Sequence, residues 1–124
     1  MTNHKVKCAN FEIANNRPFT LIAGPCQLES EQHALEVSHE LKKITSDLKI
    51  NLIYKTSFDK ANRTSLKGKR GIGLEKSLSI FDKIRKKVGV PVLTDVHTAE
   101  QCSIVAKHVD VLQIPAFLCR QTDL

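Results

Sequence analysis

Cationic and amide side chains gather between residues 55 and 64, where they offer many hydrogen-bond donors to an anion. Arg63 is able to grip a phosphate through two parallel hydrogen bonds, whereas the ammonium group of Lys60 acts as a point charge. The alternative is that these charges are simply solvated in a loop. The polar residues of this stretch are Lys55, Ser57, Asp59, Lys60, Asn62, Arg63 and Thr64.

Three other residues have side chains that suit metal binding or acid–base chemistry. Cys26 follows Gly24-Pro25, and a lone thiol in such a turn is a metal ligand, a nucleophile or a small packing residue. Asp95 and His97 form either a metal or acid–base pair, or a hydrogen-bonded support for other groups. Their spacing alone leaves these alternatives open.

Short apolar runs alternate with helical patterns along the chain. The runs at 19–23, 52–58, 90–94 and 111–114 predict four strands. Apolar residues at steps of three and four predict helices over 31–48, 74–88 and 99–109. Ser30 is the expected N-cap of the first helix, Gly89 ends the second, and Thr98 with Gln101 has capping-box spacing before the third.

This order of elements predicts an α/β fold with a parallel sheet. A (β/α)8 barrel takes about 250 residues, so the 124 residues suit about four βα units, the N-terminal half of a TIM barrel. We expect an N-terminal extension over 1–18 and a partial barrel over 19–124 that stops after its fourth strand. Such a half barrel has two open edges and an uncovered inner face.

The candidate residues follow the carboxyl ends of the predicted strands, where ligands bind in parallel α/β folds. Gln113 ends the fourth strand, as Asp95 follows the third. Lys55 and Ser57 share one face of the second strand, so Lys55 either meets an anion there or reaches solvent. The arrangement predicts a pocket for an anionic, hydroxylated small molecule.

Composition narrows the class of partner. The net charge of +6 suits anions, but only 5% of the residues are aromatic, which disfavours nucleic-acid binding. No apolar run is long enough to span a bilayer, and the N-terminus has no secretory pattern. The four cysteines form no C-x-x-C pair, so we expect a cytoplasmic protein without a disulfide framework.

Five motifs in this order make the chain resemble the 3-deoxy-D-manno-octulosonate 8-phosphate synthases, also called 2-dehydro-3-deoxyphosphooctonate aldolases. They are I-A-G-P-C at 22–26, F-D-K-A-N-R-T-S at 58–65, R-G-x-G-L-E at 70–75, T-D-V-H at 94–97 and Q-I-P-A-F-L-C-R-Q-T-D-L at 113–124. The K-A-N-R segment differs from the K-P-R-T-like loop of the related 3-deoxy-heptulosonate 7-phosphate synthases. These motifs extend from the first predicted strand to Leu124.

The resemblance implies a (β/α)8 barrel, usually a homotetramer, that condenses phosphoenolpyruvate with arabinose 5-phosphate for lipopolysaccharide (Kdo) synthesis. It implies that phosphoenolpyruvate binds to Lys55, Ser57 and Lys60, and that arabinose 5-phosphate binds to Asn62, Arg63 and Thr64. Thr64 stands where members commonly have Ser and keeps the hydroxyl. Catalytic roles are implied for Lys60 and Asp95, a place beside the substrates for Gln113, and contact with a neighbouring subunit's sugar-phosphate site for Arg120.

Cys26 resembles the marker of the metal-dependent class of these enzymes, in which it binds a divalent ion such as zinc, iron or manganese. The other ligands of the family come from later strands, and His97 does not replace them. Two alternatives remain besides this enzyme: a non-catalytic half barrel or interaction module, and a related heptulosonate phosphate synthase.

Overall fold

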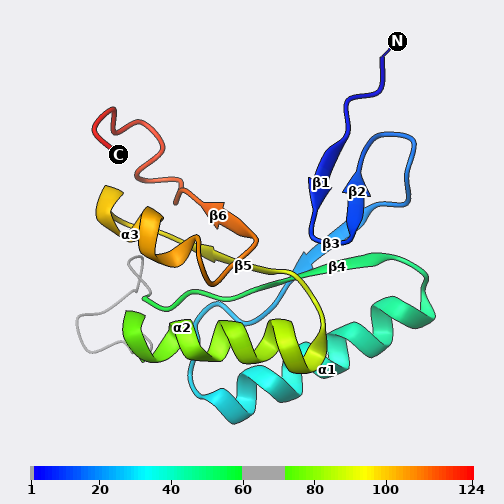
Figure 1. Ribbon diagram of the computed structural model, residues 1–124, viewed down its shortest axis with the longest axis horizontal. Coiled ribbons are helices and arrows are strands. Elements are labelled where there is room, and N and C mark those ends of the chain that lie inside the picture. The colour runs from blue at the N-terminus through cyan, green and yellow to red at the C-terminus, as the bar shows by residue number, and fades with distance from the viewer. Residues whose placement is uncertain (1, 60–71) are drawn as a thin grey trace.

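The structure is a computed structural model that describes residues 2–59 and 72–124 (Figure 1). At its centre lies a four-stranded parallel sheet whose strands are neighbours in chain order: β3 (Thr20–Ala23), β4 (Asn51–Lys55), β5 (Val92–Asp95) and β6 (Val111–Gln113). Parallel neighbours need crossover connections, and these contain α1 (Glu31–Asp47), α2 (Leu74–Lys83) and α3 (Ala99–Val105). The predicted α/β class is confirmed, and the topology is consistent with half of a TIM barrel.

The helix ends largely follow the predicted signals. Ser30 caps α1, because its Oγ accepts a hydrogen bond from the backbone N–H of His33 at 3.1 Å. The second predicted helix divides into α2 and a π-helical turn, η1 (Ile84–Val88). Gly89 ends η1 in the left-handed conformation, with φ of 74°, which a residue with a Cβ adopts at a cost. No helix of the described residues is long and apolar enough to cross a membrane.

The main hydrophobic core fills the space between the sheet and the helices. Figure 1 shows α1 and α2 side by side on one side of the sheet. Tyr54 and Val92, from adjacent strands, are fully buried here and belong to the same cluster as Phe81 of α2 and Val105 of α3. Because side chains alternate across a strand, residues 53 and 55 of β4 face the opposite side, here called the inner face.

A β-hairpin that the sequence analysis did not predict covers part of this inner face. It consists of β1 (Val6–Cys8) and β2 (Phe11–Ile13), and Figure 1 shows it on the side of the sheet away from α1 and α2. Cys8 forms a small second core with Ile53 and Leu93, against which Phe11, Ile13 and Val111 pack. The expectation of an uncovered inner face is therefore wrong at the hairpin, where these contacts remove apolar surface from water.

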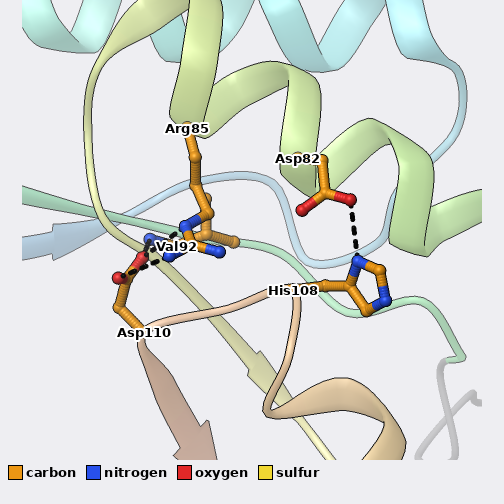
Figure 2. A network of polar contacts seen from close by, with 5 residues as sticks. All are labelled: Asp82, Arg85, Val92, His108 and Asp110. Atoms are coloured by element: carbon orange, nitrogen blue, oxygen red, sulfur yellow. Dashed lines mark hydrogen bonds and ion pairs between the residues drawn. The ribbon is translucent and has the colours of Figure 1, made fainter.

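A polar network ties the amino-terminal ends of β5 and β6 to the helices (Figure 2). The carboxylate of Asp110 accepts the backbone N–H of Val92 at 2.9 Å and contacts Arg85 Nε at 3.2 Å. His108 Nδ1 lies 2.8 Å from an Asp82 carboxylate oxygen on α2. These contacts lie at the end of the sheet opposite the candidate residues, which indicates a role in stability.

Candidate active site at the strand ends

The register of the sheet brings three predicted residues to one edge of the inner face. Asp95 at the end of β5 is paired directly with Gln113 at the end of β6. Lys55 ends β4 in register with Leu93, one inward-facing step before Asp95. By the alternation of side chains, all three share the face of Ile53. A cation, a carboxylate and an amide thus converge as predicted, each only partly exposed.

Gly24 allows the first turn to pass directly over the backbone of Lys55. A Cβ built on Gly24 would lie 1.7 Å from the carbonyl oxygen of Lys55, far inside van der Waals contact. A residue without a side chain is therefore required here for steric reasons. The turn then presents Cys26 as an exposed free thiol beside the carboxyl ends of the strands.

Ser57 lies just beyond β4 and is largely buried. Its Oγ donates a hydrogen bond to the carbonyl of Asp59 at 2.8 Å, and its backbone forms a parallel bridge with Gln27. The Ser57 carbonyl also accepts the backbone N–H of Leu28 at 2.8 Å. In this arrangement Ser57 shapes the chain entering the cationic stretch, and its hydroxyl oxygen remains able to accept a hydrogen bond from a ligand.

Asp95 and His97 lie together in a largely buried position. His97 Nε2 is 3.1 Å from Asp95 Oδ2, but the two atoms do not meet hydrogen-bond geometry. The His97 ring packs against Phe58 in an edge-to-face arrangement. The backbone N–H of His97 donates a hydrogen bond to Gln101 Oε1 at 2.8 Å. Gln101 thus reaches back one residue beyond Thr98, whose side chain makes no capping hydrogen bond.

The polar atoms of this pair have unused hydrogen-bonding capacity. Asp95 Oδ1 and both ring nitrogens of His97 are buried and have no hydrogen-bond partner among the described residues. Unsatisfied buried polar atoms are rare in native proteins, and a catalytic role or a bound water or ion is a common explanation for them. Loose alignment of such groups is also usual in a site without its substrate.

Several predicted residues cannot be placed by this geometry. Lys60, Asn62, Arg63 and Thr64 lie outside the described residues. Arg120 is exposed in the segment that follows β6. Among the described residues, Lys55 is therefore the one predicted cation that lies at the same edge of the sheet as Asp95.

The described residues do not complete a metal site. Among residues 2–59 and 72–124, no group of three or more His, Cys, Asp or Glu side chains is placed to hold a metal ion. A cysteine ligand such as Cys26 suits zinc or iron, but such ions take about four ligands. Cys26 is therefore at most one donor of a larger set.

The sequence matches a profile of the DAHP synthetase I family over residues 3–124. The chain belongs to the DAHP synthetase I family. Membership is consistent with the parallel sheet and its alternating helices. The profile covers both the hairpin and the strand ends.

The curated proteins that are similar to this chain have a more specific name than the family. The 2-dehydro-3-deoxyphosphooctonate aldolase of Brucella anthropi is 61% identical over 122 residues, which is 98% of this chain and 44% of the relative. The aldolases of the same name from Brucella ovis and Brucella canis are each 62% identical over the same shares. The chain thus spans less than half the length of the relatives that it matches.

Proposed function

We propose that the protein acts in the condensation of phosphoenolpyruvate with D-arabinose 5-phosphate, which gives 3-deoxy-D-manno-octulosonate 8-phosphate and phosphate for Kdo synthesis. The observation that carries this proposal is the convergence of Lys55, Asp95 and Gln113 on one edge of the inner face. The name of the relatives, at 61% identity over nearly the whole chain, supports this reaction over others.

The two substrates are anions, which explains the residue types. We assign Lys55, Ser57 and Lys60 to the carboxylate and phosphate of phosphoenolpyruvate. Carbon 3 of phosphoenolpyruvate attacks the aldehyde carbon, water adds at carbon 2, and the resulting hemiketal phosphate loses inorganic phosphate. Holding the two reactants in line accounts for much of the rate, and we assign to Asp95 the role of holding or moving a proton beside them.

Arabinose 5-phosphate is assigned to the rest of the cationic stretch, Asn62, Arg63 and Thr64, with Gln113 alongside. Arg120 is exposed beyond β6, in keeping with a role at a neighbouring subunit's site in a homotetramer. The proposed setting is the cytoplasm.

Cys26 is proposed as one ligand of a divalent zinc, iron or manganese ion. Bound there, such an ion would act as a Lewis acid near the aldehyde or the attacking water. Because the described residues supply an incomplete donor set, no step of the reaction is assigned to the metal.

A second candidate is a non-catalytic half barrel that acts only as an interaction module. The observation in its favour is that β3 and β6 each have one paired neighbour in the described sheet, so that both edges are open. Apolar side chains are also exposed at these edges, with Ile22 of β3 at 50% exposure and Phe117 beyond β6 at 79%.

Binding of phosphoenolpyruvate tests the proposed site without requiring turnover. We expect its 31P resonance to shift on titration with the chain. Lys55→Met should weaken this binding about tenfold or more, because it removes a charge-assisted contact. The matched control is Lys43→Met, which removes an exposed lysine of α1 and should leave binding unchanged. Equal binding by both variants would show that Lys55 does not hold the anion.

A further inference from the structure

Two buried threonine hydroxyls lie behind the candidate site, on the helix side of the sheet. Thr56 follows β4 directly and Thr94 lies in β5, and both residues are 0% exposed. Neither Oγ1 has a hydrogen-bond partner among the described residues. A buried hydroxyl without a partner is costly, and native proteins commonly satisfy such groups with an internal water.

The register of the sheet places these two hydroxyls side by side. Lys55 is paired with Leu93, and the backbone N–H of Thr56 donates to the Leu93 carbonyl at 3.3 Å, so Thr56 is level with Thr94. Both residues share the strand face of Tyr54 and Val92, which belong to the main core. Neither side chain therefore points toward the inner face.

The spacing of neighbouring strands fits one bridging molecule. Side chains at the same level of adjacent strands are about 4.8 Å apart. A water that hydrogen-bonds two hydroxyls at about 2.8 Å each, with a near-tetrahedral angle, joins oxygens about 4.5 Å apart. A direct hydroxyl–hydroxyl bond requires about 2.8 Å, and the two hydroxyls do not form one in the structure, because neither Oγ1 has a partner among the described residues.

We propose that Thr56 and Thr94 bind one internal water between the sheet and its helices. The water joins the ends of β4 and β5 from behind, where the next residues along the chain are Ser57 and Asp95. It needs no metal and no substrate, so it stands or falls independently of the proposed reaction.

Conservative substitutions in the 124-residue chain test this water by the sign of their effect. Valine keeps the shape of threonine and removes the hydroxyl. If the water bridges the pair, Thr56→Val and Thr94→Val each lower the melting temperature by about 3–6 °C. If the hydroxyls are dry, removing an unpaired buried group raises the melting temperature, and the proposal is wrong. Thr56→Ser and Thr94→Ser keep the hydroxyl and should recover part of the loss.

The double variant distinguishes one shared water from two independent effects, because only a shared water makes the two losses in melting temperature non-additive. The double variant should lose clearly less than the sum of the single losses, because either valine alone already breaks the bridge. Thr45→Val is the matched control, since Thr45 is buried but bonds the Leu41 carbonyl of its own helix at 2.9 Å. Its effect should add to that of Thr56→Val. Full additivity between Thr56→Val and Thr94→Val would contradict the bridge.

Direct detection completes the test. In the isotopically labelled chain we expect magnetization transfer from water to the methyl groups of Thr56 and Thr94. In either valine variant we expect its loss at the threonine that remains. Its absence in the wild-type chain would overturn the proposal. So would a chain without cooperative unfolding, because the site requires a packed core.

Discussion

Substitution of Gly24 by alanine should damage the candidate site through a single steric contact. The new Cβ would lie 1.7 Å from the carbonyl oxygen of Lys55 and 2.8 Å from its carbonyl carbon. Cβ contacts under 3.0 Å are essentially never seen, so one of the two backbones must move by about 1.3 Å. The contact joins two main chains, and neither is able to swing aside as a flexible side chain would.

The loss in unfolding free energy expected for Gly24→Ala follows from the position of Gly24 beside the buried strand β4. Gly24 comes directly after β3, whose last paired residue, Ala23, is in register with Tyr54 of the buried strand β4. Overpacking inside a well-packed protein costs about 1–3 kcal/mol, and a clash between two backbones should cost about 3 kcal/mol. Lys55 should move with its carbonyl, so the proposed binding of phosphoenolpyruvate at the strand ends should weaken as well.

Urea unfolding of Gly24→Ala and Gly89→Ala measures the effect against a matched control. Gly89 has a φ of 74°, and its nearest contact to a built Cβ is the flexible Lys42 ammonium group at 3.3 Å. Gly89→Ala should therefore cost only the strain of the left-handed conformation, about 1–2 kcal/mol. A Gly24→Ala variant within about 0.5 kcal/mol of the wild type would refute the reasoning from the close approach.

Three other predictions concern stability and reactivity. Asp110→Asn breaks the ion pair with Arg85 and should cost about 1–2 kcal/mol of unfolding free energy, discounted because Arg85 is one-third exposed. Burial raises the pKa of Tyr54 to about 12, above its usual 10, so the neutral phenol is favoured in the folded state. Stability should be unaffected below pH 10 and fall by about 2–3 kcal/mol as the pH rises to 12. Burial, with the nearby Asp110 charge, raises the pKa of the Cys8 thiol, so a thiol reagent at pH 8 should modify exposed Cys26 well before Cys8.

Each of these has a simple control. Asp47→Asn changes an exposed aspartate and should leave the free energy of unfolding unchanged. An equal loss in both variants would show that the contacts of Asp110 do not cause the effect. Tyr54→Phe should abolish the alkaline decrease, and a decrease that persists would assign it to another group. Cys8 modified as fast as Cys26 would contradict the packing of the hairpin against the inner face.

The strands of the sheet and the helices that connect them were predictable, because each element buries one face whose apolar residues recur at a regular spacing. The strand predicted over 52–58 ends at Lys55 in the structure, because the chain leaves the ladder to bridge Gln27 through Ser57. The shared face that the period of two predicts for Lys55 and Ser57 stays a prediction, because Ser57 lies beyond the end of β4. The pairing of Asp95 with Gln113 required the register of the sheet, which no local pattern sets.

The hairpin was missed although its signal is visible in retrospect. Apolar residues alternate with polar ones in V-K-C and F-E-I, and Cys8 pairs with Phe11 across a two-residue turn. Such turns favour glycine or asparagine at positive φ, but the first turn residue is Ala9, with φ of 48°. The first position of the turn therefore lacks the usual residue, although Asn10 follows it, and packing of the hairpin on Ile53 and Leu93 compensates for the strain.

The division of the second helix was equally hidden from the sequence. The apolar positions from Leu74 to Val88 continue through both α2 and η1. A π-helical turn changes the hydrogen-bond pattern without removing the apolar face, so periodicity alone does not reveal it. The place of Gln101 beside His97 was also missed, because the capping-box spacing pointed to Thr98.

Turnover tests the central claim most directly. The chain, loaded with a divalent metal, should be assayed alone and mixed with the part of the Brucella anthropi aldolase that it does not match. We predict that the mixture releases phosphate only when phosphoenolpyruvate and arabinose 5-phosphate are both present, and that Lys55→Met abolishes the release. Preference for erythrose 4-phosphate, or no turnover by a mixture that has formed a folded complex, would contradict the assignment.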